Sequence, residues 1–237
     1  MLESLRNKKI LLVVAHPDDE LLGPGASMNR LIQDFNAIVR VLILGEGITS
    51  RSDVRDQEKW KEQLAEHKKN IESAAKQIGF EKVITYNFPD NRFDSVDLLD
   101  LIKTIEKEKE EFNPDVIFTH HGGDVNIDHK RTFEAVHTSI RPMQSENVKM
   151  LFTFETASGT EWIPSTDERV FKPNFYVEIS ETNLQAKIKG MESYTFEKRS
   201  YPHPRSPESL RILAQYRGQT VGVHMAEAFC LVRSLNS

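Results

Sequence analysis

The sequence predicts an α/β protein in which helices cover a mainly parallel sheet. Apolar runs of strand length alternate with helix-length segments over roughly the first two thirds of its 237 residues. Two of the predicted strands end abruptly in clusters of His and Asp side chains. Such alternation is typical of βαβ units with right-handed crossovers, so the strands are expected to point the same way.

Glycine and proline residues mark the boundaries of these elements. Pro17 follows the first apolar strand, Gly45 the second and Pro89 the third, while Gly79 closes a charged helix and Pro207 opens the last helix. Continuous apolar runs of this length are expected of buried strands, and apolar residues at helical spacing are expected of helices packed against them. The predicted strands are 10–15, 37–44, 82–88, 115–119, 150–155, 174–179 and 228–232, and the predicted helices are 22–35, 53–77, 96–112, 130–139, 184–194 and 206–218.

Length, charge and cysteine content limit the classes of protein to which this chain can belong. The length suits one large α/β domain, and the absence of repeats, low-complexity tracts and linkers predicts a single domain over 1–237. A net charge of −5 gives no reason to expect nucleic acid or an anionic membrane surface as a partner. The single cysteine, Cys230, excludes an intrachain disulfide, and its apolar surroundings predict buried packing.

The sequence also bears on location and assembly. It has no long uncharged apolar segment, and residues 1–9 lack the apolar centre of a signal peptide, so we expect no membrane segment and a cytoplasmic protein. The oligomeric state is left open, and a homo-oligomer is compatible with the sequence.

The most informative stretch is 16–20, His-Pro-Asp-Asp-Glu, which directly follows the first apolar strand. The carboxyl ends of strands in open α/β sheets form the crevice where ligands bind. Imidazole and carboxylate groups suit zinc or another divalent metal. The stretch therefore predicts a metal site with further carboxylates available for proton transfer.

A second polar cluster, 124–129, follows the fourth strand and precedes the helix 130–139. Because parallel strands end at the same edge of a sheet, the two clusters are expected to meet. His16, Asp19 and His129 would then form a set of two imidazoles and one carboxylate, which leaves a fourth position open as in catalytic zinc sites. Iron(II) suits the same ligands.

Other polar residues have expected roles around this site. Asp18, beside the ligands, is a candidate general base, and Asp128 is expected to orient the ring of His129. Asp90 and Arg92 lie just past the third strand, where they either contact substrate or serve a local turn. At least one of the histidines at 120–121 is expected to be structural. His67 and His137, within charged or amphipathic helices, are expected to take no part in the site.

The paired motifs 15–20 and 124–129 resemble the PIG-L/LmbE-type family of zinc-dependent N-deacetylases, and the stretch 205–229 resembles that family's C-terminal part. The resemblance implies a Rossmann-like three-layer sandwich and hydrolysis of an N-acetyl group on a small-molecule amino sugar. It implies His16, Asp19 and His129 as zinc ligands and Asp18 as base. It also implies that Arg51 lies beside the substrate.

One position departs from this pattern. Asn126 stands where members of the family often carry a histidine that polarises the amide carbonyl. An asparagine can donate a neutral hydrogen bond but cannot act as an acid. His224 and His121 are the alternative sources of a proton donor.

The sequence bears differently on three alternative functions. Removal of another acyl group, such as formyl, from an amino sugar or nucleotide sugar needs the same chemistry and stays open. A non-catalytic module that binds metal or sugar on the same fold would have no use for the candidate base Asp18. Dinucleotide binding is disfavoured, because the first strand leads into carboxylates and not into a glycine-rich turn.

Overall fold

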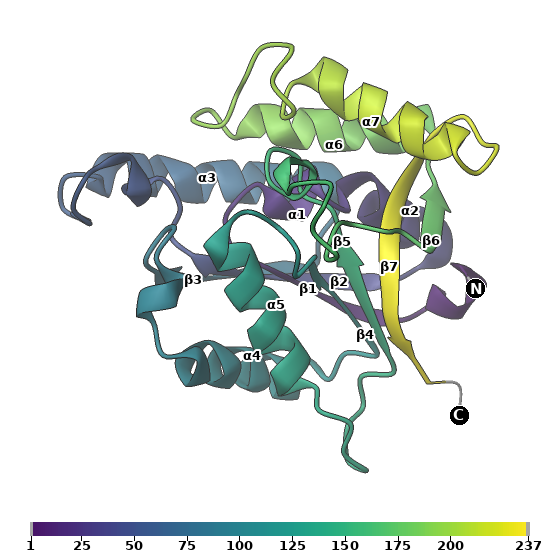
Figure 1. Ribbon diagram of the computed structural model, residues 1–237, viewed down its shortest axis with the longest axis horizontal. Helices are drawn as coiled ribbons and strands as arrows, with labels where there is room; N and C mark the ends of the chain where they lie inside the picture. Colours follow the sequence, from purple (N-terminus) through teal and green to yellow (C-terminus); the bar gives the residue numbers. More distant parts are fainter. Residues whose placement is uncertain (1, 236–237) are drawn as a thin grey trace.

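The computed structural model describes residues 2–235 and shows one sheet of seven strands in the order β3-β2-β1-β4-β5-β7-β6 (Figure 1). Strands β1 to β5 pair in parallel, and β7 runs antiparallel to both β5 and β6. The prediction of a mainly parallel sheet is confirmed. The strands are β1 Lys9–Val14, β2 Ile38–Gly45, β3 Lys82–Phe88, β4 Val116–His120, β5 Met150–Phe154, β6 Phe175–Glu178 and β7 Ala226–Ser234.

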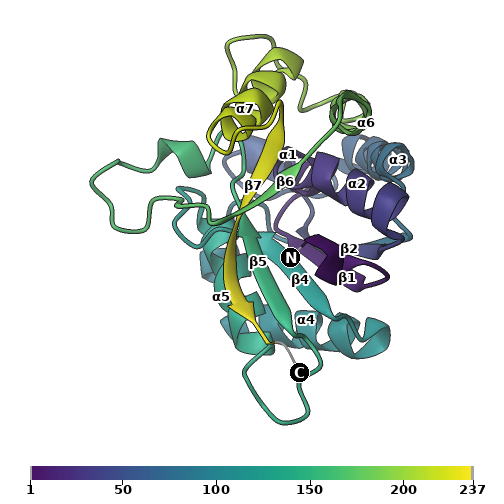
Figure 2. The same ribbon diagram turned by 90° about the vertical axis from the view of Figure 1, so that its right-hand side faces the viewer.

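Helices cover both faces of the sheet and produce three layers. Figures 1 and 2 show α1, α2, α3, α6 and α7 over one face and α4 and α5 over the other. This arrangement is the predicted Rossmann-like sandwich. The helices are α1 Asp19–Leu22, α2 Gly25–Phe35, α3 Lys61–Ile78, α4 Leu98–Phe112, α5 Ile127–Ser139, α6 Glu181–Ser193 and α7 Pro207–Gln219.

The apolar run of β1 supplies both cores because successive side chains of a strand point to opposite faces. Ile10, Leu12 and Val14 belong to the core beneath α2, α3 and α6. Leu11 and Val13 belong to the core against α4 and α5. All five side chains are fully buried, which is why this strand is continuously apolar and does not alternate with polar residues.

Two predicted helices have different boundaries in the structure. The helix predicted over 22–35 begins at Gly25 as α2, and a short helix that was not predicted, α1, precedes it. Between the two helices, a Cβ at Gly23 would come within 2.2 Å of the Phe154 ring. The helix predicted over 53–77 begins only at Lys61. In the preceding loop, Arg55 donates two hydrogen bonds to the buried Glu46 carboxylate, at 2.8 and 2.9 Å. This tertiary contact overrides the helical pattern of the local sequence.

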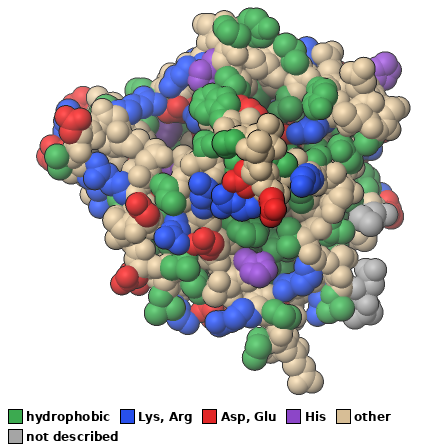
Figure 3. All heavy atoms as spheres, in the orientation of Figure 1, with side chains coloured by type: hydrophobic (Ala, Val, Ile, Leu, Met, Phe, Trp, Pro, Cys, Tyr) green, Lys and Arg blue, Asp and Glu red, His purple; other side chains and the backbone are tan. Residues whose placement is uncertain are grey.

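The structure also tests the expectations about a membrane segment, surface charge and the single cysteine. Within residues 2–235, no helix combines the length and the apolar character needed to span a bilayer. Acidic and basic side chains are intermingled on the face shown in Figure 3. Cys230 is half-buried, not fully buried as predicted, and its Sγ lies 3.2 Å from the Lys172 carbonyl oxygen.

A buried ion pair joins the helical layer to the sheet. The Lys187 ammonium of α6 lies 2.6 Å from the Glu227 carboxylate of β7 and also donates to the carbonyl oxygens of Leu22 and Gly23. Glu227 in turn accepts backbone N–H groups from the first turn of α2. Because each charge is paired and hydrogen-bonded, the pair is tolerated in the interior.

Removal of this cation is expected to destabilise the fold. Lys187→Met leaves the Glu227 carboxylate buried without its counter-charge, so we expect a loss of about 3–5 kcal/mol in the free energy of unfolding. Urea denaturation followed by circular dichroism measures the loss. Lys189→Met is the matched control, because Lys189 is exposed on the same helix, and it should change stability by less than about 0.5 kcal/mol. Equal effects of the two variants would contradict the prediction.

Candidate active site

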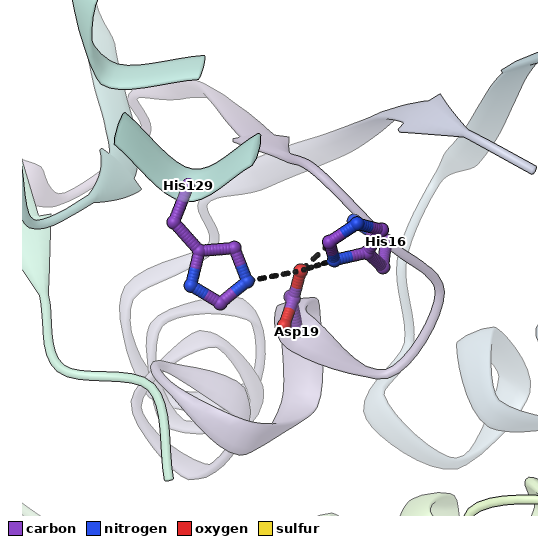
Figure 4. A group of neighbouring side chains, drawn as sticks. All are labelled: His16, Asp19 and His129. Carbon is purple, nitrogen blue, oxygen red and sulfur yellow. Dashed lines mark hydrogen bonds and ion pairs between the residues drawn. The ribbon is translucent and has the colours of Figure 1, made fainter. Parts of the chain in front are cut away.

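The pairing of β1 with β4 places the two His/Asp clusters at one edge of the sheet. His16 and Asp19 come from the turn after β1, and His129 comes from the first turn of α5 (Figure 4). The Asp19 Oδ2 atom lies 3.3 Å from His16 Nδ1 and 3.3 Å from His129 Nε2. Asp19 and His129 are 1% and 3% exposed. The structure thus brings together the three residues that the sequence proposed as ligands.

The spacing of these three atoms fits a divalent metal. Zinc bonds to nitrogen and oxygen are about 2.0–2.1 Å long, so two ligand atoms of a tetrahedral site lie about 3.3 Å apart. The donor set of two imidazoles and one carboxylate suits zinc and iron(II) alike. One carboxylate oxygen facing two imidazole nitrogens at this separation is therefore an arrangement that can hold such an ion.

His120 lies close to this set, but its nitrogens are used elsewhere. Its Nε2 is 3.4 Å from Asp19 Oδ2, yet it accepts the Ala15 N–H at 2.9 Å. The proton is therefore on Nδ1, which lies 3.1 Å from Thr156 Oγ1. The ring stacks on that of His129, with 3.9 Å between the centroids. His120 supports the neighbouring imidazole and offers no free nitrogen to a metal, in agreement with the structural role expected of one histidine here.

Carboxylates behind the site hold both imidazoles. His16 Nε2 lies 2.9 Å from Asp128 Oδ2, and the Asp128 carboxylate also accepts the backbone N–H groups of Asn91 and Phe93. His129 Nδ1 lies 3.1 Å from Asp124 Oδ2. The expectation that Asp128 orients His129 is thus wrong. Adjacent residues of a helix point in different directions, so Asp128 cannot face the ring that follows it in sequence.

The charges of this cluster shift several pKa values. Burial opposes ionisation of Asp19, but the charge of His129 and the contact with His120 hold its pKa well below the usual range. Burial likewise disfavours a charged His129, yet Asp19 and Asp124 raise its pKa to about 9. The surrounding carboxylates therefore favour positive charge at these imidazoles. A bound dication would supply that charge in place of the protons.

The candidate base Asp18 is buried and held from two sides. Its backbone has a φ of 103°, a conformation that is costly for a residue other than glycine. The Asp18 N–H donates to Glu20 Oε2 at 2.9 Å, and Glu20 Oε1 accepts the Tyr194 hydroxyl at 2.5 Å. Its carboxylate lies 2.7 Å from Arg205 Nη1. Burial raises the pKa of Asp18 well above its usual value, although Arg205 opposes the shift.

Arg205 begins a chain of ion pairs that the sequence alone did not indicate. Its guanidinium also binds Glu197, at 3.0 Å, and Ser158 Oγ, at 2.7 Å. Glu197 in turn pairs with Arg51. Arg205 falls within the stretch 205–229, which resembles the family's C-terminal part. That resemblance is a sequence signal that could have pointed to Arg205 as a residue of the site. No sequence signal singles out Glu197, because its partners lie far from it along the chain.

A cavity of about 320 Å³ opens in front of these residues. Arg51, Asp90 and Asn126 line it, as expected of residues placed beside a substrate. Trp162 also lines the cavity and is 56% exposed. The other lining residues include His16, Asp18, Gly47, Ser158, Glu197, His203 and Arg205.

The protein itself occupies most polar atoms of the lining residues Asp90 and Asn126. Asn126 is the N-cap of α5: its Oδ1 accepts the Asp128 N–H at 2.8 Å, and its Nδ2 donates to Asn91 Oδ1 at 2.9 Å. Asp90 accepts the Ser50 N–H at 3.0 Å and lies 3.4 Å from His16 Nε2. The turn role that the sequence left open for Asp90 is therefore present together with its position in the pocket.

Four expectations about other residues differ from the structure. Arg92 donates to the Asp53 carbonyl oxygen at 3.1 Å and is not among the residues that line the cavity. His224 is exposed in the turn between α7 and β7, also outside the cavity lining. His121 is likewise absent from that lining, and its Nε2 lies 2.7 Å from the Arg169 carbonyl oxygen. By contrast, His67, which was expected to take no part, lines the cavity.

The fold and site define a class of protein: an α/β sandwich with a buried imidazole–carboxylate cluster at the carboxyl edge of its sheet. The sequence pattern of the PIG-L family, described as GlcNAc-PI de-N-acetylase, matches residues 11–140. The chain belongs to this family and so to a class of deacetylase enzymes. The "uncharacterized deacetylase YaiS" of Escherichia coli strain K12 is 28% identical over 181 residues, which cover 74% of this chain and 89% of that protein.

Solved structures share the fold over nearly the whole chain. The N,N'-diacetylchitobiose deacetylase of Pyrococcus horikoshii has a TM-score of 0.71 at 20% identity, covering 95% of this chain and 84% of that one. The zinc-inhibited form of teicoplanin deacetylase Orf2 has a TM-score of 0.73 at 16% identity, with 97% and 100% covered. GalB of Pseudomonas putida KT2440, a 4-carboxy-2-hydroxymuconate hydratase, has a TM-score of 0.69 at 16% identity, with 97% and 98% covered.

The buried His67 is expected to affect stability in acid. Burial lowers the pKa of His67 to about 4, and the charge of Arg51 acts in the same direction. A histidine with a depressed pKa in the fold contributes stability above its unfolded pKa of 6.5, and this contribution is lost as the pH falls toward 4. Over that interval, wild type should lose more stability than His67→Leu, by up to roughly 3 kcal/mol. Urea denaturation at a series of pH values tests this, and parallel curves for the two proteins would refute it.

Proposed function

We propose that this protein removes the N-acetyl group from an amino sugar or sugar conjugate by metal-dependent hydrolysis. The observation that carries the proposal is that Asp18 lines one cavity together with His16, which forms a possible metal-binding group with Asp19 and His129. Membership of the PIG-L family supports the deacetylase reaction, and three related proteins carry deacetylase in their names. The sugar itself is not identified by these observations.

The proposed ligands are His16 Nδ1, Asp19 Oδ2 and His129 Nε2. A divalent metal held by them supplies Lewis acidity, which polarises a carbonyl group and lowers the pKa of a water molecule. Zinc and iron(II) both suit this set. Asp128 and Asp124 fix the two rings from behind, so that the ligand nitrogens face Asp19 before any ion enters.

Asp18 would transfer the proton in both halves of the reaction. As water adds to the acetamide carbonyl carbon, Asp18 accepts a proton from it. As the C–N bond breaks, Asp18 returns that proton to the amine nitrogen, which yields acetate and a free amine. Arg205 supports the first half because its contact with Asp18 favours the ionised carboxylate. Glu20 fixes the backbone that presents the carboxylate to the cavity.

Asn126 is the proposed hydrogen-bond donor to the substrate carbonyl oxygen. Its Nδ2 carries two hydrogens, and the contact with Asn91 uses one of them. Capping of α5 fixes the side chain at the cavity wall. A donor held in place before the reaction stabilises the negative charge that develops on the oxygen. A neutral amide can fill this role without giving up a proton.

Metal binding tests the proposed ligand set. We expect about one zinc or iron per chain in protein purified without chelators, and loss of that metal in both His16→Ala and His129→Ala. Each substitution removes one of three protein ligands, which lowers affinity steeply. Elemental analysis by mass spectrometry measures the content. His137→Ala is the matched control, since His137 lies on α5 outside the cavity lining and should leave the metal in place. Retention of metal in His16→Ala and His129→Ala would exclude this site.

The role of Asp18 has its own test. Asp18→Asn keeps the size of the side chain and its ability to form hydrogen bonds, but an amide cannot accept the proton. The kcat for release of acetate should therefore fall at least a hundredfold. The metal content should stay at the wild-type level. Acetate release from N-acetylglucosamine, N-acetylgalactosamine and N,N'-diacetylchitobiose gives the readout. Wild-type turnover in Asp18→Asn would remove this residue as the base. Acetate release from none of these sugars by wild type would count against the proposed substrate class.

A further inference from the structure

His67 is the one cavity residue whose side chain the described part of the protein leaves without a hydrogen bond although it is almost fully buried. The residue lies on α3 and is 2% exposed, and its Nδ1 has no hydrogen-bond partner within residues 2–235. Two aromatic rings lie beside it, with the centroids of Tyr194 and Phe196 at 5.6 and 6.1 Å. A buried polar side chain that makes no hydrogen bond within the fold is costly, so the imidazole is better explained by a role in binding than by a role in folding.

The ring borders the cavity described above. His67 lines the same 320 Å³ cavity as Asp18 and Arg51. Its Nε2 faces Gly47, where an added Cβ would come within 3.1 Å of that nitrogen. Gly47 also lines the cavity, and a side chain at this position would crowd Nε2. Nε2 is therefore the atom through which a ligand in the cavity would contact the imidazole.

The chemistry of the group indicates what it binds. The interior disfavours a charged ring, and a neutral imidazole offers one donor and one acceptor. The nitrogen near the cavity lining is Nε2, and a hydroxyl group can donate to it or accept from it, according to which ring nitrogen carries the proton. Hydroxyl groups are the main polar substituents of a sugar. An anionic substituent would gain little at an uncharged ring, whereas Arg51 and Arg199 present cations at other points of the wall.

We propose that His67 binds a hydroxyl group of the sugar substrate and so helps to determine which sugar is accepted. The inference rests on the proposed function, because it deepens the substrate side of the same site. His67 is a recognition residue in this account and takes no part in proton transfer to the acyl group. Its imidazole is retained for binding and not for folding.

Two independent measurements test this role. The first is thermal denaturation of His67→Leu near neutral pH without sugar. If the imidazole serves only a ligand, an apolar side chain should fold with an equal or higher Tm, because an unpaired polar group has been removed. A large fall in Tm, like that of a core cavity variant, would show a structural role and overturn the proposal.

The second measurement is recognition of sugar by the metal-loaded protein. For whichever of N-acetylglucosamine, N-acetylgalactosamine and N,N'-diacetylchitobiose is deacetylated, His67→Leu should raise KM about tenfold with a smaller change in kcat. His67→Gln, which keeps a donor and an acceptor, should recover much of the affinity. His137→Leu is the matched control and should match wild type. Unchanged KM in His67→Leu would overturn the inference.

A failure of the proposed deacetylase function can be distinguished from a failure of the role proposed for His67. If wild type deacetylates none of the three sugars, the reaction assigned above fails, and calorimetric titration of the same sugars decides the role of His67. Weaker binding by His67→Leu than by wild type would still support recognition at this residue. Absence of binding to wild type, or equal binding to both proteins, would overturn it.

Discussion

Strands β1 and β4 pair in parallel, with Val13 opposite Thr119, and each is followed at once by a polar turn. This pairing is the constraint on which the site depends. The two turns are more than a hundred residues apart in sequence, yet the shared edge brings Asp19 Oδ2 within 3.3 Å of His129 Nε2. The buried strands of the sheet cannot slip by one residue without moving core side chains to the wrong face, so the register also fixes the distance between the turns.

Much of the fold and the centre of the site could be predicted from the sequence. Continuous apolar runs locate β1 and β4, and the rule that parallel strands end together brings His16, Asp19 and His129 to one place. Predictions failed where tertiary contacts decide the outcome. The loop before α3 is held by Arg55 on Glu46, and the orientation of His129 depends on Asp124 instead of its neighbour Asp128. His67 was misjudged because its helix reads as charged, whereas the cavity it lines is formed by segments distant in sequence.

Alternating charges connect four residues that line the cavity. From Asp18 through Arg205 and Glu197 to Arg51, each group meets a partner of opposite sign. Such a chain lets a buried carboxylate remain available for proton exchange without leaving an isolated charge in the interior. It also couples the candidate base to the wall that faces the substrate. Arg51 and Asp18 are therefore connected through three ion pairs, with Glu197 and Arg205 between them.

The same fold supports different reactions, since a hydratase and deacetylases all match this chain with TM-scores near 0.7. The sandwich alone therefore does not define the chemistry. The sheet supplies an edge where loops meet, and the side chains at that edge decide what reacts there. In this chain the edge holds two imidazoles aligned by separate carboxylates and a carboxylate held on a strained backbone. Backbone strain opposes folding, and shifted buried charges cluster at functional sites, so their concentration at one cavity argues that the cavity is where the protein acts.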